Sequence, residues 1–379
     1  MTEQSVFSKG LEDVVAGESS ICSIDGKNSK LAYRGYEIHD LSQNSNFDEV
    51  AYLLLNGELP TAKEFADFKA SVAQERQIPK EVLEHIQRFP KNIHPMAALR
   101  TGVSMLSFYD AEADNKSIEA NRRKALRLVA KTPAIVAAYE RYRKGQAYIA
   151  PKADPNIGTA ANFLYMIRGK EASPVEIKTL DRYFVLLAEH DLNASTFSGR
   201  VIVSTESDMY SGITGAIGAL KGDLHGSANS RSMESLLEVG DINNVEAYVD
   251  KMFAAKKKFM GFGHRVYKGP DPRAAELKEM AKVLSQSNAD QAKFYAISER
   301  MEKAIWDRKQ LYCNVDFYSA SVLYTIGIPI DQFTAMFAIS RMTGWTAHIL
   351  EQCMDNRLLR PVSQYVGKGL RSYAPVDKR

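Results

Sequence analysis

The chain has 379 residues, and 45% of them are hydrophobic, so it can bury a large core in one domain or in two unequal ones. Its 49 basic and 46 acidic residues leave a net charge of only +3, which argues against a nucleic-acid-binding protein. Cys22, Cys313 and Cys353 are too widely spaced for a disulfide framework or a structural zinc site. No apolar run approaches the roughly 20 residues of a membrane span, so we expect a soluble cytoplasmic protein.

The N-terminal part of the chain predicts a small β-hairpin. Residues 1–15 are polar and of mixed charge, which is not typical of a secretory signal or a transit peptide. The segments 21–24 and 31–34 have strand character, and Asp25-Gly26 between them favours a turn. No series of alternating strands and helices follows, so the predicted fold class is all-α with one hairpin.

Helical patterns fill most of the remaining chain. A capping box of Thr61 and Glu64 marks the start of one helix. Another helix contains Gly212, Gly215 and Gly218, although glycine costs roughly 1 kcal/mol at each interior position of a helix. This stripe favours close packing against another helix, within one subunit or across a dimer, over flexibility. Besides the helix that follows Thr61, the predicted helices cover residues 47–55, 95–108, 117–143, 157–168, 174–189, 208–220, 244–257, 273–286, 290–308 and 331–351.

Four of the seven histidines have ordinary structural explanations. His39 and His85 lie in charged surroundings that are typical of a surface. His94 precedes a proline at a predicted helix start, where a structural role and a ligand role are equally plausible. His348 lies on a largely apolar helix and is expected to be a core histidine whose hydrogen bonds are satisfied.

The other three histidines lie at helix ends beside small residues. His190 precedes the segment DLNAST, His225 lies in GDLHGSAN, and His264 lies in GFGHRVYKGPDPR. Neighbouring glycines let a ligand approach the backbone, and helix ends expose unpaired amides and carbonyls. Together with the single acid Asp316 in CNVDFYS, these residues are candidates for a catalytic site.

Three classes of function remain open at this point. A metal-dependent hydrolase would use the histidines and Asp316 as ligands, but the chain has none of the usual metal-ligand spacings. Acid–base catalysis on an anionic substrate is favoured by Arg273, Arg341 and Arg360, which we place at helix starts or turns suited to gripping carboxylates. A non-catalytic nucleotide-binding module would use the loop at residue 261 with the lysines 256–258, but this segment fails both common phosphate-loop motifs.

Six ordered motifs resemble the citrate synthase family. They are HGSAN with His225, GFGHRVYKGPDPR with His264 and Arg273, NVDFYS with Asp316, AEHDLNASTF with His190, SRMTGWTAHILEQ with Arg341 and RPVSQYVG with Arg360. The resemblance extends over nearly the whole chain, from about Lys9 to the C-terminal end. It implies an almost wholly helical homodimer, with a large domain of residues 1–225 and 328–379 that carries the dimer interface. Residues 226–327 would form a small domain that closes over the substrates, and the glycine stripe would belong to the packing between subunits.

The resemblance also implies a role for each site residue in a citrate synthase that condenses acetyl-CoA with oxaloacetate. Asp316 would remove the α-proton of acetyl-CoA, His225 would stabilise the resulting enol, and His264 would protonate the ketone of oxaloacetate. No metal is implied, because arginines would neutralise the oxaloacetate dianion, and no cofactor is implied, because the CoA thioester is a substrate. Oxaloacetate would be held by His190, Asn193, Arg273 and Arg341, with Arg360 from the partner subunit, and CoA by Lys256, Lys257, Lys258, Phe259, Met260 and Lys268.

This sequence departs from the family pattern at four positions. Ser227 and Ser230 replace a usual glycine and acid in the first motif, and Cys313 and Ala320 replace a common proline and glycine around Asp316. None of these changes removes a catalytic group, but they leave open 2-methylcitrate synthase, which uses propionyl-CoA, because one methylene is worth only about 1–3 kcal/mol in an apolar pocket. Only about thirty residues precede the YRGY segment at Tyr33, so we expect a homodimer without strong inhibition by NADH.

Overall fold

The computed structural model describes residues 7–287 and 289–379, so the first six residues of the N-terminal segment discussed above lie outside the described residues. The described chain is mostly helical, as the sequence predicts. The strands are β1 (Cys22–Asp25), β2 (Lys30–Tyr33) and β3 (Tyr36–Glu37). The helices are α1 (Ile38–Asn44), α2 (Phe47–Asn56), α3 (Ala62–Glu75), α4 (Lys80–Ile86), α5 (Pro95–Leu106), α6 (Ile118–Arg143), α7 (Thr159–Arg168), α8 (Pro174–Leu187), α9 (Ala194–Ser204), α10 (Met209–Leu220), α11 (Ala228–Val239), α12 (Val245–Ala254), α13 (Pro272–Ser287), α14 (Ala289–Lys309), α15 (Val315–Thr325) and α16 (Phe333–Met354).

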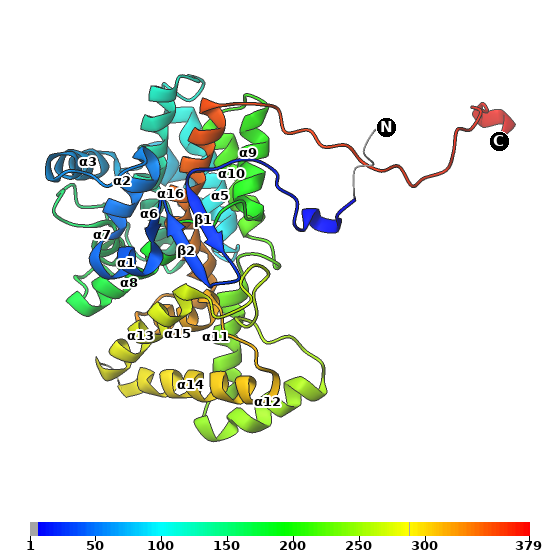
Figure 1. Ribbon diagram of the computed structural model, residues 1–379. Helices are drawn as coiled ribbons and strands as arrows, with labels where there is room; N and C mark the ends of the chain where they lie inside the picture. Colours follow the sequence, from blue (N-terminus) through cyan, green and yellow to red (C-terminus); the bar gives the residue numbers. More distant parts are fainter. Residues whose placement is uncertain (1–6, 288) are drawn as a thin grey trace.

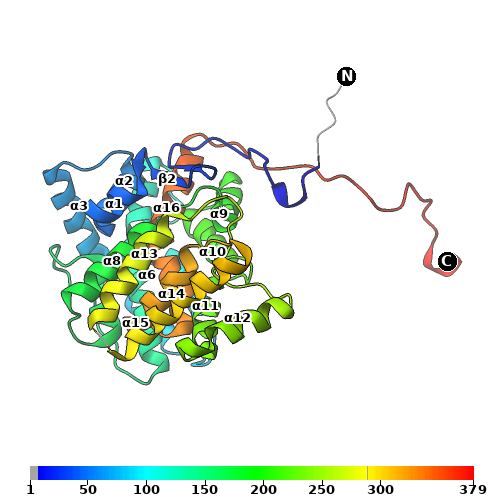
Figure 2. The same ribbon diagram turned by 60° about the horizontal axis from the view of Figure 1, so that its bottom comes forward.

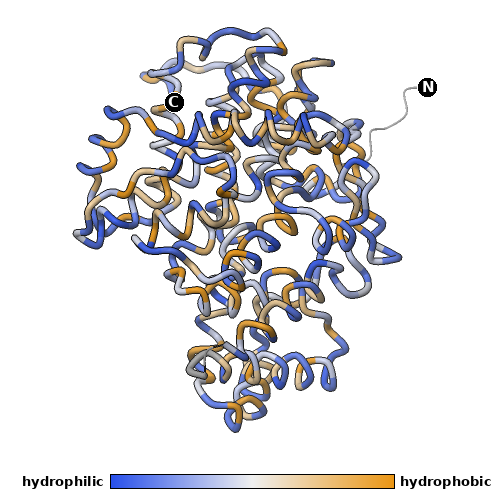
Figure 3. The backbone as a smooth tube through the Cα atoms, turned by 90° about the vertical axis from the view of Figure 1, so that its left-hand side faces the viewer, coloured by the Kyte–Doolittle hydropathy of each residue, from blue (hydrophilic) through white to orange (hydrophobic). Residues whose placement is uncertain are grey.

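The helices gather in two lobes (Figure 1). The upper lobe contains α1–α10 and the returning helix α16, and the lower lobe contains α11–α15. Figure 2 shows α13 lying beside α8 where the two lobes meet, and these helices contact one another. Figure 3 shows hydrophobic and hydrophilic residues alternating along most helical coils, as expected of helices that bury one side.

The predicted hairpin is confirmed. β1 and β2 pair antiparallel with Cys22 opposite Tyr33, and the short strand β3, which the sequence did not predict, adds to β2 through Ala32 opposite Glu37. The Tyr33 side chain is fully buried and its hydroxyl donates toward the carbonyls of Leu186 and Glu189 at 3.1 and 3.0 Å. The hairpin is thereby anchored to the chain just before His190.

The predicted capping box at Thr61 is confirmed. The Thr61 hydroxyl accepts from the Glu64 amide, and the Glu64 carboxylate accepts from the Thr61 amide at 2.8 Å. A second capping box of the same kind begins α8, where Ser173 and Glu176 exchange the same pair of bonds. Each box satisfies amides that would otherwise be unpaired at a helix start.

The glycine stripe of α10 packs closely within the subunit. A Cβ on Gly212 would lie 2.7 Å from Val203 Cγ1 on α9, and one on Gly215 would lie 2.2 Å from Ile202 Cδ1. The approach of α9 therefore favours glycine at position 212, whereas at position 215 only the end of the Ile202 side chain would have to move. The third glycine, Gly218, has nothing closer than an arginine carbon at 3.9 Å, so its face of the helix is open in the single chain.

Helix α16 runs through the centre of the upper lobe with nearly every side chain buried. His348 is fully buried and hydrogen-bonded, as the sequence predicts: its Nε2 lies 2.9 Å from the Glu189 carboxylate, and the Arg200 guanidinium approaches its Nδ1 at 3.1 Å. Arg200 also binds the Glu351 carboxylate at 2.7 Å. These four side chains form a row with a carboxylate at each end and His348 and Arg200 between them, which we call the α16 charge row.

The chain leaves the body after α16. Residues 355–379 extend away from the upper lobe (Figure 1), and their apolar side chains are exposed, among them Val362, Tyr365, Val366 and Leu370. Within the described ranges, no helix is long and apolar enough to cross a membrane.

Candidate active site

The segment after α8 presents His190. Asp191 adopts a left-handed conformation with φ of 52°, which turns the chain so that Asn193 can cap α9. The Asn193 side-chain oxygen accepts from the amides of Ser195 and Thr196 at 3.2 and 3.1 Å. The Asn193 side chain is thus occupied in holding the loop, and its contribution to a ligand site is to fix the position of His190.

His225 lies between α10 and α11 and is held as one tautomer. Its Nε2 faces the backbone amide of Ser195 at 3.3 Å, and an amide can only donate, so Nε2 is the unprotonated nitrogen. The Ser195 hydroxyl lies 2.8 Å from the same nitrogen and accepts from the Trp345 indole at 3.0 Å. The neutral ring therefore carries its proton on Nδ1, where it can donate to a substrate.

His264 is fixed by its own loop. Its Nδ1 accepts from the amides of Val266 and Tyr267 at 3.0 and 3.2 Å, so the neutral ring carries its proton on Nε2. The ring lies 5.4 Å from that of His190 and 4.6 Å from that of Tyr267, centroid to centroid. The Tyr267 hydroxyl is in turn 3.2 Å from His190 Nε2, which joins the two histidines that the sequence places far apart.

The three histidines are kept neutral. Burial, together with the positive charge of Arg341 for His225 and of Arg273 for His264, lowers the pKa of each of these two rings to about 4. Burial likewise lowers the pKa of His190 well below its usual value, with Arg273 and Arg341 acting in the same direction. At neutral pH these rings are therefore uncharged hydrogen-bond donors beside fixed positive charge.

Arg273 begins α13 and is 2% exposed. The Asp271 carboxylate accepts from its Nε and NH2 groups at 3.0 and 2.9 Å, and also from the Val315 amide at the start of α15 at 3.0 Å. Burial would lower the pKa of Arg273, but the ion pair with Asp271 raises it above its usual value. Asp271, which the sequence analysis did not single out, thus ties the arginine to the helix that carries Asp316.

The loop before His264 is joined to the start of α15 by backbone contacts. The Gly263 amide donates to the Tyr312 carbonyl, the Asn314 amide donates to the Gly261 carbonyl, and the Asn314 side chain donates to the Gly263 carbonyl, each at 2.8 Å. Gly261 has φ of 79°, and a Cβ there would lie 2.9 Å from the Phe317 Cα. The close approach explains the glycines around His264 and fixes it relative to Asp316.

Asp316 lies in the first turn of α15, and Asn314 caps that helix. Burial raises the pKa of the Asp316 carboxyl to about 6, Arg273 lowers it, and Asp271 raises it. The group is therefore ionised at neutral pH but is a stronger base than an exposed aspartate. This is the pKa expected of a general base that works near neutrality.

Arg341 lies in the middle of α16, so its placement at a helix start or turn was wrong. The reason is that α16 is a single 22-residue helix that carries Arg341 into the core, where it is 1% exposed. Its Nε donates to the Leu187 carbonyl at 2.8 Å, and its guanidinium carbon lies 4.8 Å from the centre of the Phe337 ring. The centre of the same ring lies 6.5 Å from that of the His225 ring, so Phe337 is close to both the arginine and the histidine.

The remaining predicted contacts lie at the surface. Arg360 belongs to the extended C-terminal segment and is exposed, away from the residues above, so its placement at a helix start or turn was also wrong. The lysines at 256, 257, 258 and 268 are exposed, and Met260 is half-buried. Phe259, by contrast, is 7% exposed and packs on the rings of Phe253 and Phe262, so its side chain is not open to a ligand.

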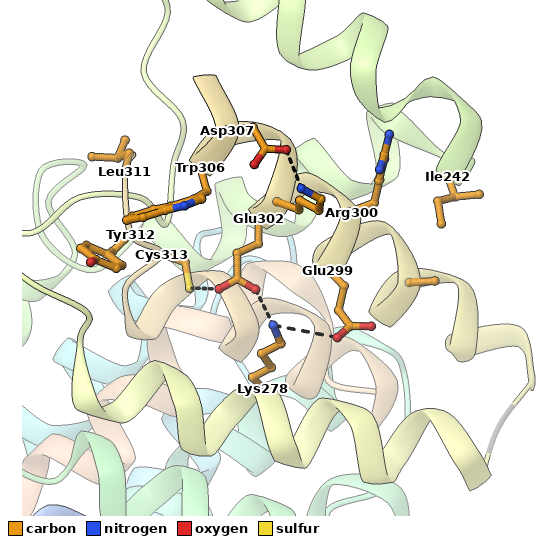
Figure 4. Close-up of a pocket in the computed structure, with 12 residues that line it drawn as sticks. Ile242, Lys278, Glu299, Arg300, Glu302, Trp306, Asp307, Leu311, Tyr312 and Cys313 are labelled. Carbon is orange, nitrogen blue, oxygen red and sulfur yellow. Dashed lines mark hydrogen bonds and ion pairs between the residues drawn. The ribbon is translucent and has the colours of Figure 1, made fainter. Parts of the chain in front are cut away.

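Two cavities accompany these residues. One of about 1010 Å³ lies beside the His225 motif and is lined by Ser227, Lys258, Met260 and Thr334 among others. The other, of about 650 Å³, lies in the lower lobe (Figure 4), with Trp306, Tyr312 and Cys313 on one side and the ion pair of Lys278 and Glu302 at its base. Neither cavity is lined by His190, His225, His264 or Asp316, but the first is lined by Ser227 and Ser230 of the His225 motif, so it is the candidate substrate site. Among residues 7–287 and 289–379, no group of three His, Cys, Asp or Glu side chains could hold a metal ion.

The arrangement of histidines, arginines and acid can be compared with known proteins. The family model described as citrate synthase, C-terminal domain, matches residues 10–362. The chain belongs to the citrate synthase family. It is 49% identical to citrate synthase 2 of Bacillus subtilis over 98% of this chain and 99% of that protein, and 40% identical to a 2-methylcitrate synthase of Shewanella oneidensis over 98% and 97%.

Solved citrate synthases share the fold. The structure from Thermoplasma acidophilum, a ternary complex with carboxymethyl-CoA and oxaloacetate, superposes with a TM-score of 0.92 at 35% identity and covers 99% of this chain and 100% of that one. The structure from Thermotoga maritima superposes with a TM-score of 0.88 at 42% identity, with 99% of both chains covered. The chain is thus an acyltransferase of the citrate synthase type.

Within this family, the four unusual residues have structural partners. The Ser230 hydroxyl donates to the Ile330 carbonyl at 3.0 Å, and that of Ser227 donates to the Asp223 carbonyl at 3.1 Å. The Cys313 thiol donates to the Glu302 carboxylate at 3.3 Å, and Ala320 is fully buried. None of these side chains takes part in the hydrogen bonds that orient His225, His264 or Arg273.

Proposed function

We propose that the protein condenses acetyl-CoA with oxaloacetate and hydrolyses the resulting citryl-CoA to citrate and CoA. The observation that carries this proposal is the charge arrangement around Asp316. A carboxylate with a pKa of about 6 accompanies two neutral histidines, which carry their protons on Nδ1 of His225 and Nε2 of His264, and two buried arginines supply the positive charge. Together these groups supply a base to form an enol, donors to stabilise it, and positive charge to bind a dianion beside it.

Oxaloacetate would bind between Arg273, Arg341 and His190. Asp271 occupies the Nε and NH2 atoms of Arg273, and Leu187 occupies the Nε of Arg341, so the remaining guanidinium nitrogens are available to carboxylates. Burial strengthens these charge-assisted bonds because little water competes for them. The arginines neutralise the dianion without a metal ion, and we propose that the enzyme needs no cofactor.

The first chemical step would be proton removal from the methyl group of acetyl-CoA by Asp316. This carbon is a very weak acid, and the negative charge that develops moves to the thioester oxygen. The Nδ1–H of His225 is positioned to donate to that oxygen and stabilise the enol, which lowers the barrier to proton removal. Because His225 is neutral, it acts on the thioester oxygen as an uncharged hydrogen-bond donor.

In the second step the enol carbon would attack the ketone carbon of oxaloacetate. A carbon–carbon bond forms, the carbonyl π-electrons move to oxygen, and His264 delivers the proton from Nε2 to that oxygen. Water then cleaves the thioester of citryl-CoA to release citrate and CoA. Loss of the thioester makes the overall condensation effectively irreversible.

CoA would lie over the exposed lysines beside the His264 loop. Lys256, Lys257, Lys258 and Lys268 supply positive charge for its phosphates, and Lys258 and Met260 border the larger cavity. Propionyl-CoA is the second candidate acyl donor, because the relatives include 2-methylcitrate synthases at 39–40% identity.

We also propose that the working enzyme is a homodimer whose domains, residues 1–225 with 328–379 and residues 226–327, close over the substrates. The exposed apolar side chains of residues 355–379 support a tail that docks on a second copy. That tail would carry Arg360 into the partner's site as a further ligand for oxaloacetate. Three free thiols fit a protein of the reducing cytoplasm.

Release of CoA thiol tests the reaction. With acetyl-CoA we expect release only when oxaloacetate is present, and the rate should be unchanged after treatment with a chelator. A parallel series with propionyl-CoA decides between the two acyl donors through the ratio of kcat/KM. Thioester cleavage without oxaloacetate, or loss of activity on chelation, would contradict the proposal, and binding of CoA without turnover would favour a non-catalytic module.

A further inference from the structure

The segment that carries His264 and Arg273 is held at two points by the N-terminal part of the chain. The first point is the hairpin turn, which reaches from the upper lobe to the loops above α13 (Figure 1). There the Lys268 amide donates to the Gly26 carbonyl at 2.9 Å. A Cβ on Gly26 would lie 2.4 Å from the Val266 carbonyl oxygen, so the two backbones are in direct contact.

The second point is Glu276, one turn beyond Arg273 on α13. Its carboxylate is 7% exposed and accepts from the Ser42 hydroxyl and the Gln43 amide, each at 2.7 Å. His39 Nδ1 lies 2.6 Å from its other oxygen, and the Arg182 guanidinium lies 4.0 Å away. Among the described residues, every hydrogen-bonding partner of this carboxylate lies on α1 of the upper lobe.

This arrangement is unusual for a helix of the lower lobe. A buried carboxylate needs donors, and Glu276 finds them only while α13 rests against α1. If the lobes separate, water replaces the lost donors, so the contact favours the joined state without making it irreversible. Because Glu276 and Arg273 are on the same face of the first turns of α13, the contact that holds Glu276 also holds the arginine.

We propose that Glu276 is a positioning residue that couples closure of the two lobes to oxaloacetate binding. This inference rests on the proposed function and on movement of residues 226–327 relative to the rest. Contact with Ser42 and Gln43 stabilises the closed arrangement in which Arg273 and His264 meet the substrate. Part of the affinity for oxaloacetate thus comes from residues that never touch it.

Glu276→Gln tests the coupling with little change of shape. The substitution replaces a carboxylate oxygen, which accepts hydrogen bonds, with an NH2 group, which donates them, and this group would face the donors on Ser42 and Gln43. We expect the KM for oxaloacetate to rise roughly tenfold or more, as for loss of hydrogen bonds to a charged group, while kcat is kept or raised. Glu279→Gln is the matched control, because Glu279 is an exposed carboxylate on the same helix. Quenching of tryptophan fluorescence by oxaloacetate gives the Kd independently of turnover.

A double-mutant cycle separates coupling from a merely structural role. Ser42→Ala removes one donor from the opposite lobe and should raise the same KM, but it should add little in the Glu276→Gln background. Effects that simply add, a KM equal to that of Glu279→Gln, or a lower melting temperature with unchanged KM would each overturn the proposal. If Glu276→Gln fails to fold, Ser42→Ala alone decides through its KM. Failure of the unaltered protein to condense the substrates would instead contradict the proposed function.

Discussion

At the scale of single residues, Asp316 is the group on which the chemistry depends most directly. Asp316→Asn keeps the shape of the side chain but removes the base, so substrate binding should change little while kcat falls about 10²–10⁴-fold. Steady-state kinetics with both substrates measure this, with Asp307→Asn, an exposed aspartate paired with Lys303, as the control. Normal turnover with a raised oxaloacetate KM would show that Asp316 binds substrate rather than removes a proton.

The raised pKa of Asp316 also predicts the acid limb of the pH profile. The carboxyl must be ionised to act, and burial raises its pKa to about 6, so log kcat/KM should be flat above pH 6 and fall with a slope of one below it. His225 and His264, with pKa values of about 4, would steepen the fall only in stronger acid. Circular dichroism over the same range separates titration from unfolding, and a limb centred near pH 4 would contradict the assignment.

The functional role of a residue could be predicted from the sequence only where the residue belongs to a recognisable motif. His225, His264, Asp316 and the arginines belong to ordered motifs, so their convergence could be anticipated. Asp271 and Ser195 could not be assigned roles, because their partners, the Val315 amide and His225 Nε2, are brought to them only by the fold. Asp271 lies within the GPDPR segment, two residues before Arg273. This short spacing between an acid and an arginine is the one sequence signal that could have predicted their ion pair.

At the scale of elements, we expect alanine substitutions at two glycines of the α10 stripe to have opposite effects on stability. Gly212→Ala would drive a methyl group to 2.7 Å from Val203, whose branched side chain is stiff, and should cost about 1–3 kcal/mol. Gly218→Ala meets nothing closer than 3.9 Å and should stabilise the subunit by up to about 1 kcal/mol. Urea unfolding measures both, and equal effects of the two changes would refute the packing argument.

The same pair of variants reports on the open face of α10. If Gly218 faces a second copy, Gly218→Ala should weaken the dimer even though it stabilises the subunit. Light scattering over a dilution series would show this as a higher dimer dissociation constant. An unchanged constant would place the dimer contact elsewhere on the upper lobe.

Long helices with clear periodicity could be predicted, and short or polar ones could not. Those from α5 to α8 were expected within a few residues of their ends, whereas α1, α9, α11 and α15 were not expected. α1 has only seven residues, too few to show a period. α9 and α11 are rich in serine and threonine, which locally favour turns, and they are stabilised instead by packing on α10 and α15.

At the scale of the whole molecule, the exposed tail decides what the catalytic unit is. If Arg360 completes the neighbouring site, Arg360→Ala and Asp316→Asn should each be inactive alone but partly active when refolded together. In a mixed dimer one site then holds both residues intact. Activity per mixed dimer, isolated with two different affinity tags, is the measurement.

Two results would contradict the shared site. Failure to rescue in dimers proven to be mixed would mean that Arg360 acts within its own subunit. Full activity in isolated monomers would mean that no residue crosses between subunits. Removal of residues 361–379 alone, which keeps Arg360, should loosen the dimer without changing the chemistry at saturating substrate.

The α16 charge row constrains how related sequences can diverge. Glu189, His348, Arg200 and Glu351 follow one another from beside His190 to the edge of the hairpin, with a carboxylate at each end and His348 and Arg200 between them, so replacing Arg200 or either carboxylate leaves a neighbour without its partner. Breaking one buried pair costs about 3–5 kcal/mol, whereas exchanging a whole set for well-packed apolar groups can be neutral. Substitutions here should therefore co-vary as a block across the family, and a random library screened for activity should recover them in combination rather than singly.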